Sequence, residues 1–131
     1  MLVPALLFAA AAVVGIVIAA DQMRQRDRDT RQMAVALTKG DPDRAPVLMV
    51  RYGCAGCHAI PGVAGANGQV GPPLGGIAGR VYVGGVVLNR PDDLIRWIVD
   101  PRSVDPMTAM PVTGITPDEA REVAAYLYTL R

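Results

Sequence analysis

The first twenty positions of the chain are almost uniformly apolar. Leu2 to Ala20 contains no charged or strongly polar residue, and Asp21 ends the run. As a helix, this run spans about 28 Å at a rise of about 1.5 Å per residue, close to the hydrocarbon thickness of a bilayer. Pro4 falls near the helix start, where its missing N–H matters little. The pattern predicts a single transmembrane helix over residues 1–20.

A cleaved signal peptide is the alternative interpretation of this segment. Signal peptides carry a charged n-region before an apolar stretch of about 7–15 residues. Here the apolar run is longer and no Lys or Arg precedes it, although Ala20 could still serve as the small residue of a cleavage site. Length and flanks favour an uncleaved anchor. Four arginines follow it, and the positive-inside rule alone would keep that side cytoplasmic: Arg24, Arg26, Arg28 and Arg31.

Residues 21–40 are charged at first and then apolar, with no Pro or Gly before Gly40. We expect the helix to continue through this stretch as a stalk or linker and to break at Gly40. The stretch is either a solvated stalk or a docking surface. Asp41 then predicts a helix cap with Pro42 at the first helical position, and Pro46 still falls within the first turn. This short helix leads the chain to Tyr52.

The remaining pattern alternates loops with short amphipathic helices. Residues 60–79 are rich in Gly and Pro and predict an irregular loop. Residues 81–88 predict a short hairpin with Gly84 and Gly85 at its turn, too small to imply a larger sheet. Pro91 begins a helix with Asn89 as a possible cap.

The last helices are bounded by clear signals. Asp100 precedes Pro101 and ends the helix that began at Pro91. A second loop covers 103–114, and Thr116 with Glu119 forms a capping box for a helix that reaches Leu130. This helix is expected to pack on the one before Cys54. The fold class is therefore all-α, with about four helices in a domain over 41–131.

Composition narrows the possible functions. The net charge of +1 over 131 residues gives no electrostatic case for a nucleic-acid partner. Hydrophobic residues make up 51% of the chain but aromatic residues only 5%. A domain of about 90 residues with so few aromatic side chains has a thin core. A buried apolar cofactor would supply the missing bulk.

The chemistry is concentrated in Cys54-Ala55-Gly56-Cys57-His58, which holds both cysteines and the single histidine. Cys-x-x-Cys-His is the attachment signature of a c-type haem: the thiols form thioethers and the imidazole becomes an axial iron ligand. A redox dithiol needs a βαβ context that the sequence does not show. A four-ligand zinc site needs more Cys or His than the chain has. A simple disulfide leaves His58 unexplained.

Two loops contain the expected partners of this haem. A ligating histidine usually donates its other ring N–H to a fixed acceptor, and the carbonyl of Pro72 is the candidate, with Leu74 packing on the porphyrin. A low-spin haem in an electron carrier needs a sixth ligand, and a thioether raises its potential. Met110, stiffened by Pro111, is the stronger candidate and Met107 the weaker. Either methionine could instead be core filler.

These landmarks together resemble class I monohaem cytochrome c over about residues 41–131. The match rests on Cys-Ala-Gly-Cys-His, the Gly-Pro-Pro-Leu loop at 71–74, a Trp-bearing helix, Thr-Ala-Met-Pro at 108–111 and a C-terminal helix, in that order. The resemblance implies a small all-α fold wrapped around one covalent haem c. It implies cofactor-binding roles for Cys54, Cys57, His58, Pro72, Leu74, Arg80, Trp97, Thr108 and Met110, with His58 and Met110 on the iron.

Three of these roles come from the resemblance alone. Arg80 matches a basic residue near the haem propionates, Trp97 an aromatic on the methionine side, and Thr108 a hydroxyl close to a propionate. Val50 departs from the family, which often has an aromatic there, so Tyr126 is expected to pack differently. Lys39 is the only lysine, which argues against docking through a strongly basic face and favours a weakly charged, largely apolar contact.

The appended helix is similar to that of membrane-anchored bacterial cytochromes c, and the domain is similar to those fused to, or associated with, haem–copper oxidases. The resemblance implies the bacterial inner membrane, with the haem domain on the periplasmic side despite the arginines. It implies a non-catalytic one-electron carrier between quinol–cytochrome c oxidoreductase and a terminal oxidase. The alternatives are a fixed subunit of a larger respiratory complex and a haem enzyme or sensor with an open distal site.

Overall fold

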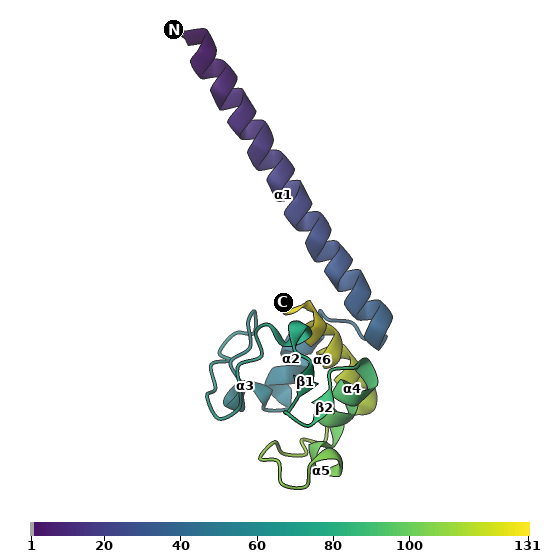
Figure 1. Cartoon of the computed structure of the whole chain (residues 1–131). Coiled ribbons are helices and arrows are strands. Elements are labelled where there is room, and N and C mark those ends of the chain that lie inside the picture. Colours follow the sequence, from purple (N-terminus) through teal and green to yellow (C-terminus); the bar gives the residue numbers. More distant parts are fainter. Residues whose placement is uncertain (1) are drawn as a thin grey trace. The chain divides into compact units, whose positions relative to one another are not determined.

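The computed structural model describes residues 2–131, with side chains from Leu7 onward; Met1, the first residue of the predicted anchor, lies outside this range. The chain divides into two compact units: the first ends at Thr30, and the second covers Arg31–Arg131. Helix α1 runs without interruption over Leu2–Thr38 (Figure 1). It is long and apolar enough to cross a membrane, and the side chains of residues 7–19 are exposed. The prediction of a helix that continues to the break at Gly40 is confirmed.

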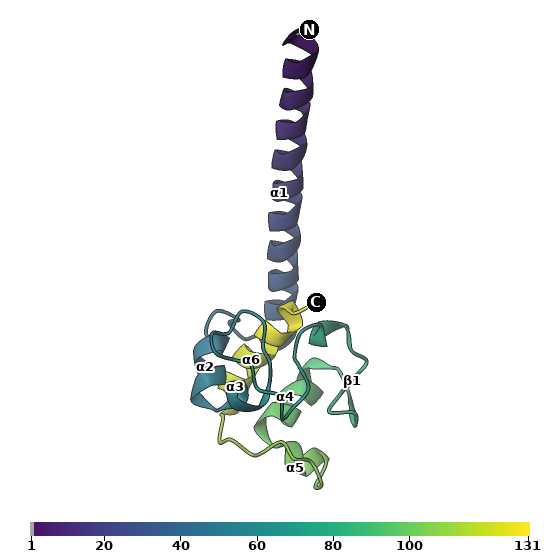
Figure 2. The ribbon, with the colours of Figure 1, turned by 90° about the vertical axis from the view of Figure 1, so that its left-hand side faces the viewer.

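The second unit is mostly helical. It contains α2 (Ala45–Arg51), α3 (Cys54–Cys57), the 3-10 turn η1 (Ile77–Gly79), α4 (Pro91–Val99), α5 (Pro101–Val104) and α6 (Pro117–Thr129). Helix α6 packs against both α2 and α4 (Figure 2). The all-α prediction is confirmed, as is the contact between the last helix and the one before Cys54. The single turns α3 and α5 are additions, because four-residue helices carry no periodic signal.

The buried core lies among α2, α4 and α6. Leu48 and Met49 of α2, Leu94 of α4, and Val123 and Leu127 of α6 are almost fully enclosed. The capping box predicted at Thr116 is present, with the Thr116 hydroxyl and the Glu119 carboxylate each bonded to the other residue's backbone N–H. Its residues are three apart in the sequence, so local geometry alone is enough to form it.

The predicted hairpin is present as β1 (Tyr82–Val83) and β2 (Val87–Leu88), paired antiparallel. Gly84 and Gly85 form its turn, with φ of 58° and 76°. Gly84 also lies against Trp97: a Cβ there would come within 2.5 Å of the indole Cζ2. The glycine is required for conformation and for space at once.

Two predicted helix caps are wrong. Helix α2 begins at Ala45 and not at Pro42: the Asp41 carboxylate accepts from the N–H of Asp43 at 3.0 Å in a turn that precedes the helix, and Arg44 at the N-cap makes no side-chain cap bond. Helix α4 has Arg90 at its N-cap and no side-chain cap, because the Asn89 side chain bonds elsewhere. Short polar side chains can bond to any nearby backbone group, and sequence spacing does not decide among them.

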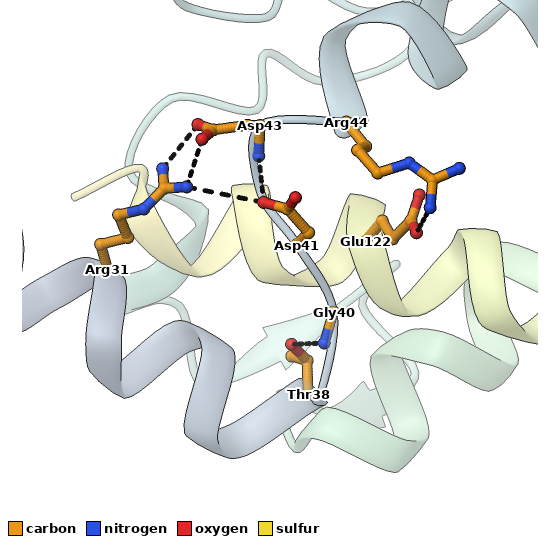
Figure 3. Close-up of polar contacts among 7 residues, drawn as sticks. All are labelled: Arg31, Thr38, Gly40, Asp41, Asp43, Arg44 and Glu122. Carbon is orange, nitrogen blue, oxygen red and sulfur yellow. Dashed lines mark hydrogen bonds and ion pairs between the residues drawn. The ribbon is translucent and has the colours of Figure 1, made fainter.

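The last turns of α1 belong to the second unit and are tied to it, and we call residues 31–44 the junction. Arg31 forms a two-pronged ion pair with Asp43 and also reaches Asp41 (Figure 3). This hydrogen bonding lowers the pKa of Asp43. Arg44 bonds to Glu122 of α6 at 2.8 Å. The two interpretations of this stretch therefore apply to different parts of the helix. Residues 21–29 are exposed, as in a stalk, whereas Ala34 and Thr38 are buried, as in a docking surface.

Gly40 is a glycine for reasons of space. Lys39, with φ of 61°, takes the left-handed conformation that ends α1, and Gly40 follows it. A Cβ on Gly40 would overlap the backbone of α6 at Arg121 and Glu122. Thr38 closes the helix end by donating to Ala34 O and accepting from Gly40 N.

Candidate functional site

A largely apolar cavity of about 320 Å³ lies within the second unit. Its walls come from α2, α3, α4, α6, the β1–β2 hairpin and the loops at 70–80 and 108–111. All nine predicted site residues line it: Cys54, Cys57, His58, Pro72, Leu74, Arg80, Trp97, Thr108 and Met110. The first and last of these nine residues, Cys54 and Met110, are 56 positions apart in the sequence and line the same cavity.

The cysteine pair lies on the single turn of α3. Gly53, at φ 77°, turns the chain sharply out of α2, and the N–H of His58 then bonds to Cys54 O at 2.9 Å. Both thiols line the cavity. Burial raises the pKa of the Cys54 thiol. The turn thus presents two sulfur atoms and, directly after them, one imidazole to the same space.

The His58 ring is held in one orientation. Its Nδ1 lies 2.7 Å from the carbonyl oxygen of Pro72. Because a carbonyl can only accept, Nδ1 donates to it, and in the neutral ring Nε2 then has the lone pair that binds a metal. Gly71 lies against the ring, where a Cβ would come within 2.7 Å of Nδ1. The N–H of Gly71 also bonds to Cys57 O at 2.7 Å.

The two methionines of the loop at 103–114 differ in burial. Met110 is half-buried and lines the cavity, and its N–H bonds to the Thr108 hydroxyl at 3.2 Å. Met107 is 89% exposed, with its N–H bonded to the Asp105 carboxylate. The structure therefore offers the Met110 thioether to the cavity and leaves that of Met107 in solvent.

Arg80 lies at the edge of the loop that carries Pro72. Its guanidinium donates to the carbonyl oxygens of Pro73 and Gly75. Leu74 lies between them and lines the cavity, with its N–H on Ala59 O at 2.9 Å. Both of these guanidinium hydrogen bonds are to backbone carbonyls, which no sequence motif predicts.

Several wall residues were not anticipated from the sequence. Met49, Val123 and Leu127 contribute from α2 and α6, and Tyr82 and Val83 from the hairpin. The helical positions follow from amphipathic periodicity, which marks them as core. Nothing in a two-residue strand marks it as the wall of a site. Tyr126, expected to pack in an unusual way, donates to Pro61 O at 2.6 Å, while Val50 is exposed.

The residues fit a covalent porphyrin. The walls are mostly aliphatic, two thiols stand on one turn, and Nε2 of the single histidine is free to bind iron. Glycines lie where a Cβ would collide with His58 or Trp97, so these side chains take the positions next to the cavity. Thiols on one short turn at this spacing suit addition to two vinyl groups of one ring.

Comparison with known families agrees with this geometry. The family model described as Cytochrome c matches residues 42–131, which is more than half of the chain. Searches of curated proteins and of solved structures returned no significant match. Family, motif and cavity together show that this chain belongs to the cytochrome c family, of class I, and carries a covalent haem c at Cys54 and Cys57.

Proposed function

We propose that the protein is a membrane-anchored electron carrier of a bacterial respiratory chain. It would pass single electrons from a quinol-oxidising complex to a terminal oxidase or another acceptor. The bound haem supplies the one-electron Fe(III)/Fe(II) couple. The observation that carries the proposal is that His58, with its ring fixed by Pro72, and Met110 both face one cavity.

The role of the chain is to bind the haem iron at both axial positions, so that no substrate can bind there. If the His58 imidazole and the Met110 thioether both bind the iron, neither oxidation state would have an open position. A thioether ligand favours Fe(II) and raises the potential. The mostly apolar walls offer water few hydrogen-bond partners, and the fixed ligands would limit rearrangement when the charge changes. These properties suit electron transfer and disfavour catalysis at the iron.

The ferric absorption spectrum of the holoprotein tests this ligand set. The weak far-red band of a Met–Fe(III) bond should be present and should be lost in Met110→Ala. Met107→Ala is the matched control and should keep it, because Met107 is exposed. A native protein that lacks the band and binds CO rapidly when reduced would instead be a haem enzyme or sensor.

We propose further that α1 anchors the protein in the inner membrane with the haem domain on the periplasmic side. The support is the apolar stretch of the helix and the site of haem attachment that the family implies. The arginines that follow the apolar stretch oppose this orientation under the positive-inside rule. Protease added to spheroplasts should remove the haem domain from the membrane. A domain that stays protected until the cells are lysed would contradict the orientation.

One observation favours the alternative of a fixed subunit in a respiratory complex. The chain enters the haem domain as an ordered helix end with Ala34 and Thr38 buried, whereas a long flexible linker would suit a shuttle. Purification in mild detergent separates the two. Stoichiometric co-elution with oxidase subunits would support the fixed subunit, and elution alone would support the shuttle.

A further inference from the structure

The side chain of Asn89 joins three segments of the domain. Its amide nitrogen donates to the carbonyl oxygens of Ile77, at 2.8 Å, and Arg80, at 2.9 Å. Its amide oxygen accepts from the Tyr128 hydroxyl at 3.1 Å. Since the two carbonyls can only accept, the amide has a single orientation. Asn89 thus connects the C-terminal end of α6 to both ends of the η1 turn.

These bonds are not needed to close the hairpin that Asn89 follows. The backbone already closes it: Tyr82 pairs with Leu88, and the Asn89 N–H bonds to Val81 O at 2.9 Å. All three side-chain partners lie outside the hairpin strands. The side chain therefore serves the η1 turn and its neighbours.

A series of hydrogen bonds leads from the η1 turn towards His58. Asn89 holds the Arg80 carbonyl, and the Arg80 guanidinium holds the carbonyls of Pro73 and Gly75. The carbonyl next to these is that of Pro72, the acceptor of the His58 ring proton. Burial, with a contribution from Asp93, raises the pKa of Tyr128 to about 12, so its hydroxyl remains a donor under ordinary conditions.

We propose that Asn89 is a positioning residue for the electron-transfer site. It fixes the backbone of Arg80, so that the guanidinium keeps the loop at 72–75 in place and the Pro72 carbonyl on His58 Nδ1. This proposal rests on the proposed function, because it takes His58 as an iron ligand. A strong hydrogen bond from the second ring nitrogen raises the basicity of a metal-binding imidazole. A looser Pro72 carbonyl therefore gives a weaker ligand and a higher reduction potential.

The test uses Asn89→Ala in the holoprotein, read by NMR and by redox titration. We expect the His58 ring N–H to exchange with solvent several-fold faster and the midpoint potential to rise. If Asn89 acts through Arg80, the changes caused by Asn89→Ala and Arg80→Gln will overlap in the double variant and not add. Unchanged exchange and potential, or effects that add fully, would overturn the proposal.

Two further variants separate positioning from general damage. Asn89→Asp keeps the shape but cannot donate to the carbonyls, so His58 exchange should be as fast as in Asn89→Ala; it decides the question if the alanine variant folds poorly. Tyr128→Phe leaves both carbonyl bonds intact and should change exchange least. Native-like exchange in Asn89→Asp would refute the proposal. The far-red band of the native protein tests the proposed function separately from the role of Asn89. Its absence from the native protein would contradict the proposed function itself.

Discussion

Helix α6 meets the rest of the domain through two unlike surfaces. At the junction it meets Gly40 with its backbone and Arg44 with the carboxylate of Glu122. At the cavity it presents Val123 and Leu127. The junction is completed by groups of the chain itself, whereas the cavity is completed by a haem. We therefore expect junction variants to change stability and leave the haem spectrum alone, and cavity variants to change the spectrum.

The largest expected effect comes from removing the covalent attachment. Cys54→Ala with Cys57→Ala leaves no thiol to form a thioether, so little or no holoprotein should be recovered. The yield is measured from the haem spectrum of denatured protein in alkaline pyridine. Gly56→Ala is the matched control on the same turn: no atom lies within 4 Å of the added Cβ, and the yield should be normal. Normal yield in the double variant would contradict the site.

Gly71→Ala tests the cavity side next. The added Cβ would press on the His58 ring, 2.7 Å from Nδ1, and either the ring or the Pro72 loop must move. Such overpacking costs about 1–3 kcal/mol, and here it should also alter the ligand-sensitive bands of the haem. Gly79→Ala places its Cβ in open space and is the control. A native spectrum in Gly71→Ala would show that the loop adjusts without moving the ligand.

Gly40→Ala is the equivalent change at the junction. Its Cβ would overlap the α6 backbone, which cannot rotate away as a side chain can. The free energy of unfolding should fall by about 1–3 kcal/mol, with the far-red band retained. Urea titration followed by fluorescence and by haem absorbance measures both. Loss of the band with no change in stability would contradict the distinction between the junction and the cavity surface of α6.

The smallest effect is expected from Glu119→Gln and depends on pH. The hydrogen bond from Tyr52, at 2.7 Å, and those from Thr116 lower the pKa of Glu119. A lowered folded pKa adds stability above the unfolded carboxyl pKa, and this is lost as pH falls through the folded value. The stability gap between native protein and variant should therefore be widest at neutral pH and close in acid.

Urea unfolding across this pH range measures the gap. Asp118→Asn is the control for a first-turn carboxylate of α6, since the Asp118 side chain is 99% exposed and forms only a 3.9 Å ion pair with Arg121. A gap for Glu119→Gln that does not change with pH would show that Tyr52 and Thr116 do not favour the charged carboxylate.

Local signals predicted local structure well. The capping box at Thr116, the hairpin turn at Gly84 and the end of α4 before Pro101 all depend on residues within a few positions of one another. The predictions for Asp41 and Asn89 as helix caps failed for different reasons. Asp41 bonds within a local turn that precedes α2, whereas tertiary packing places the Asn89 amide against the carbonyls of Ile77 and Arg80.

The sequence by itself determined the cofactor chemistry and the long apolar helix. Both follow from covalent spacing or from the composition of one continuous segment: two thiols and an imidazole within five residues, and nineteen residues without a charge. Only the tertiary structure decided that Met110 faces the cavity while Met107 faces solvent, that Gly40 serves α6, and that Asn89 connects Tyr128 to Arg80. These contacts join residues far apart in the chain, and their distances are set by how the helices pack.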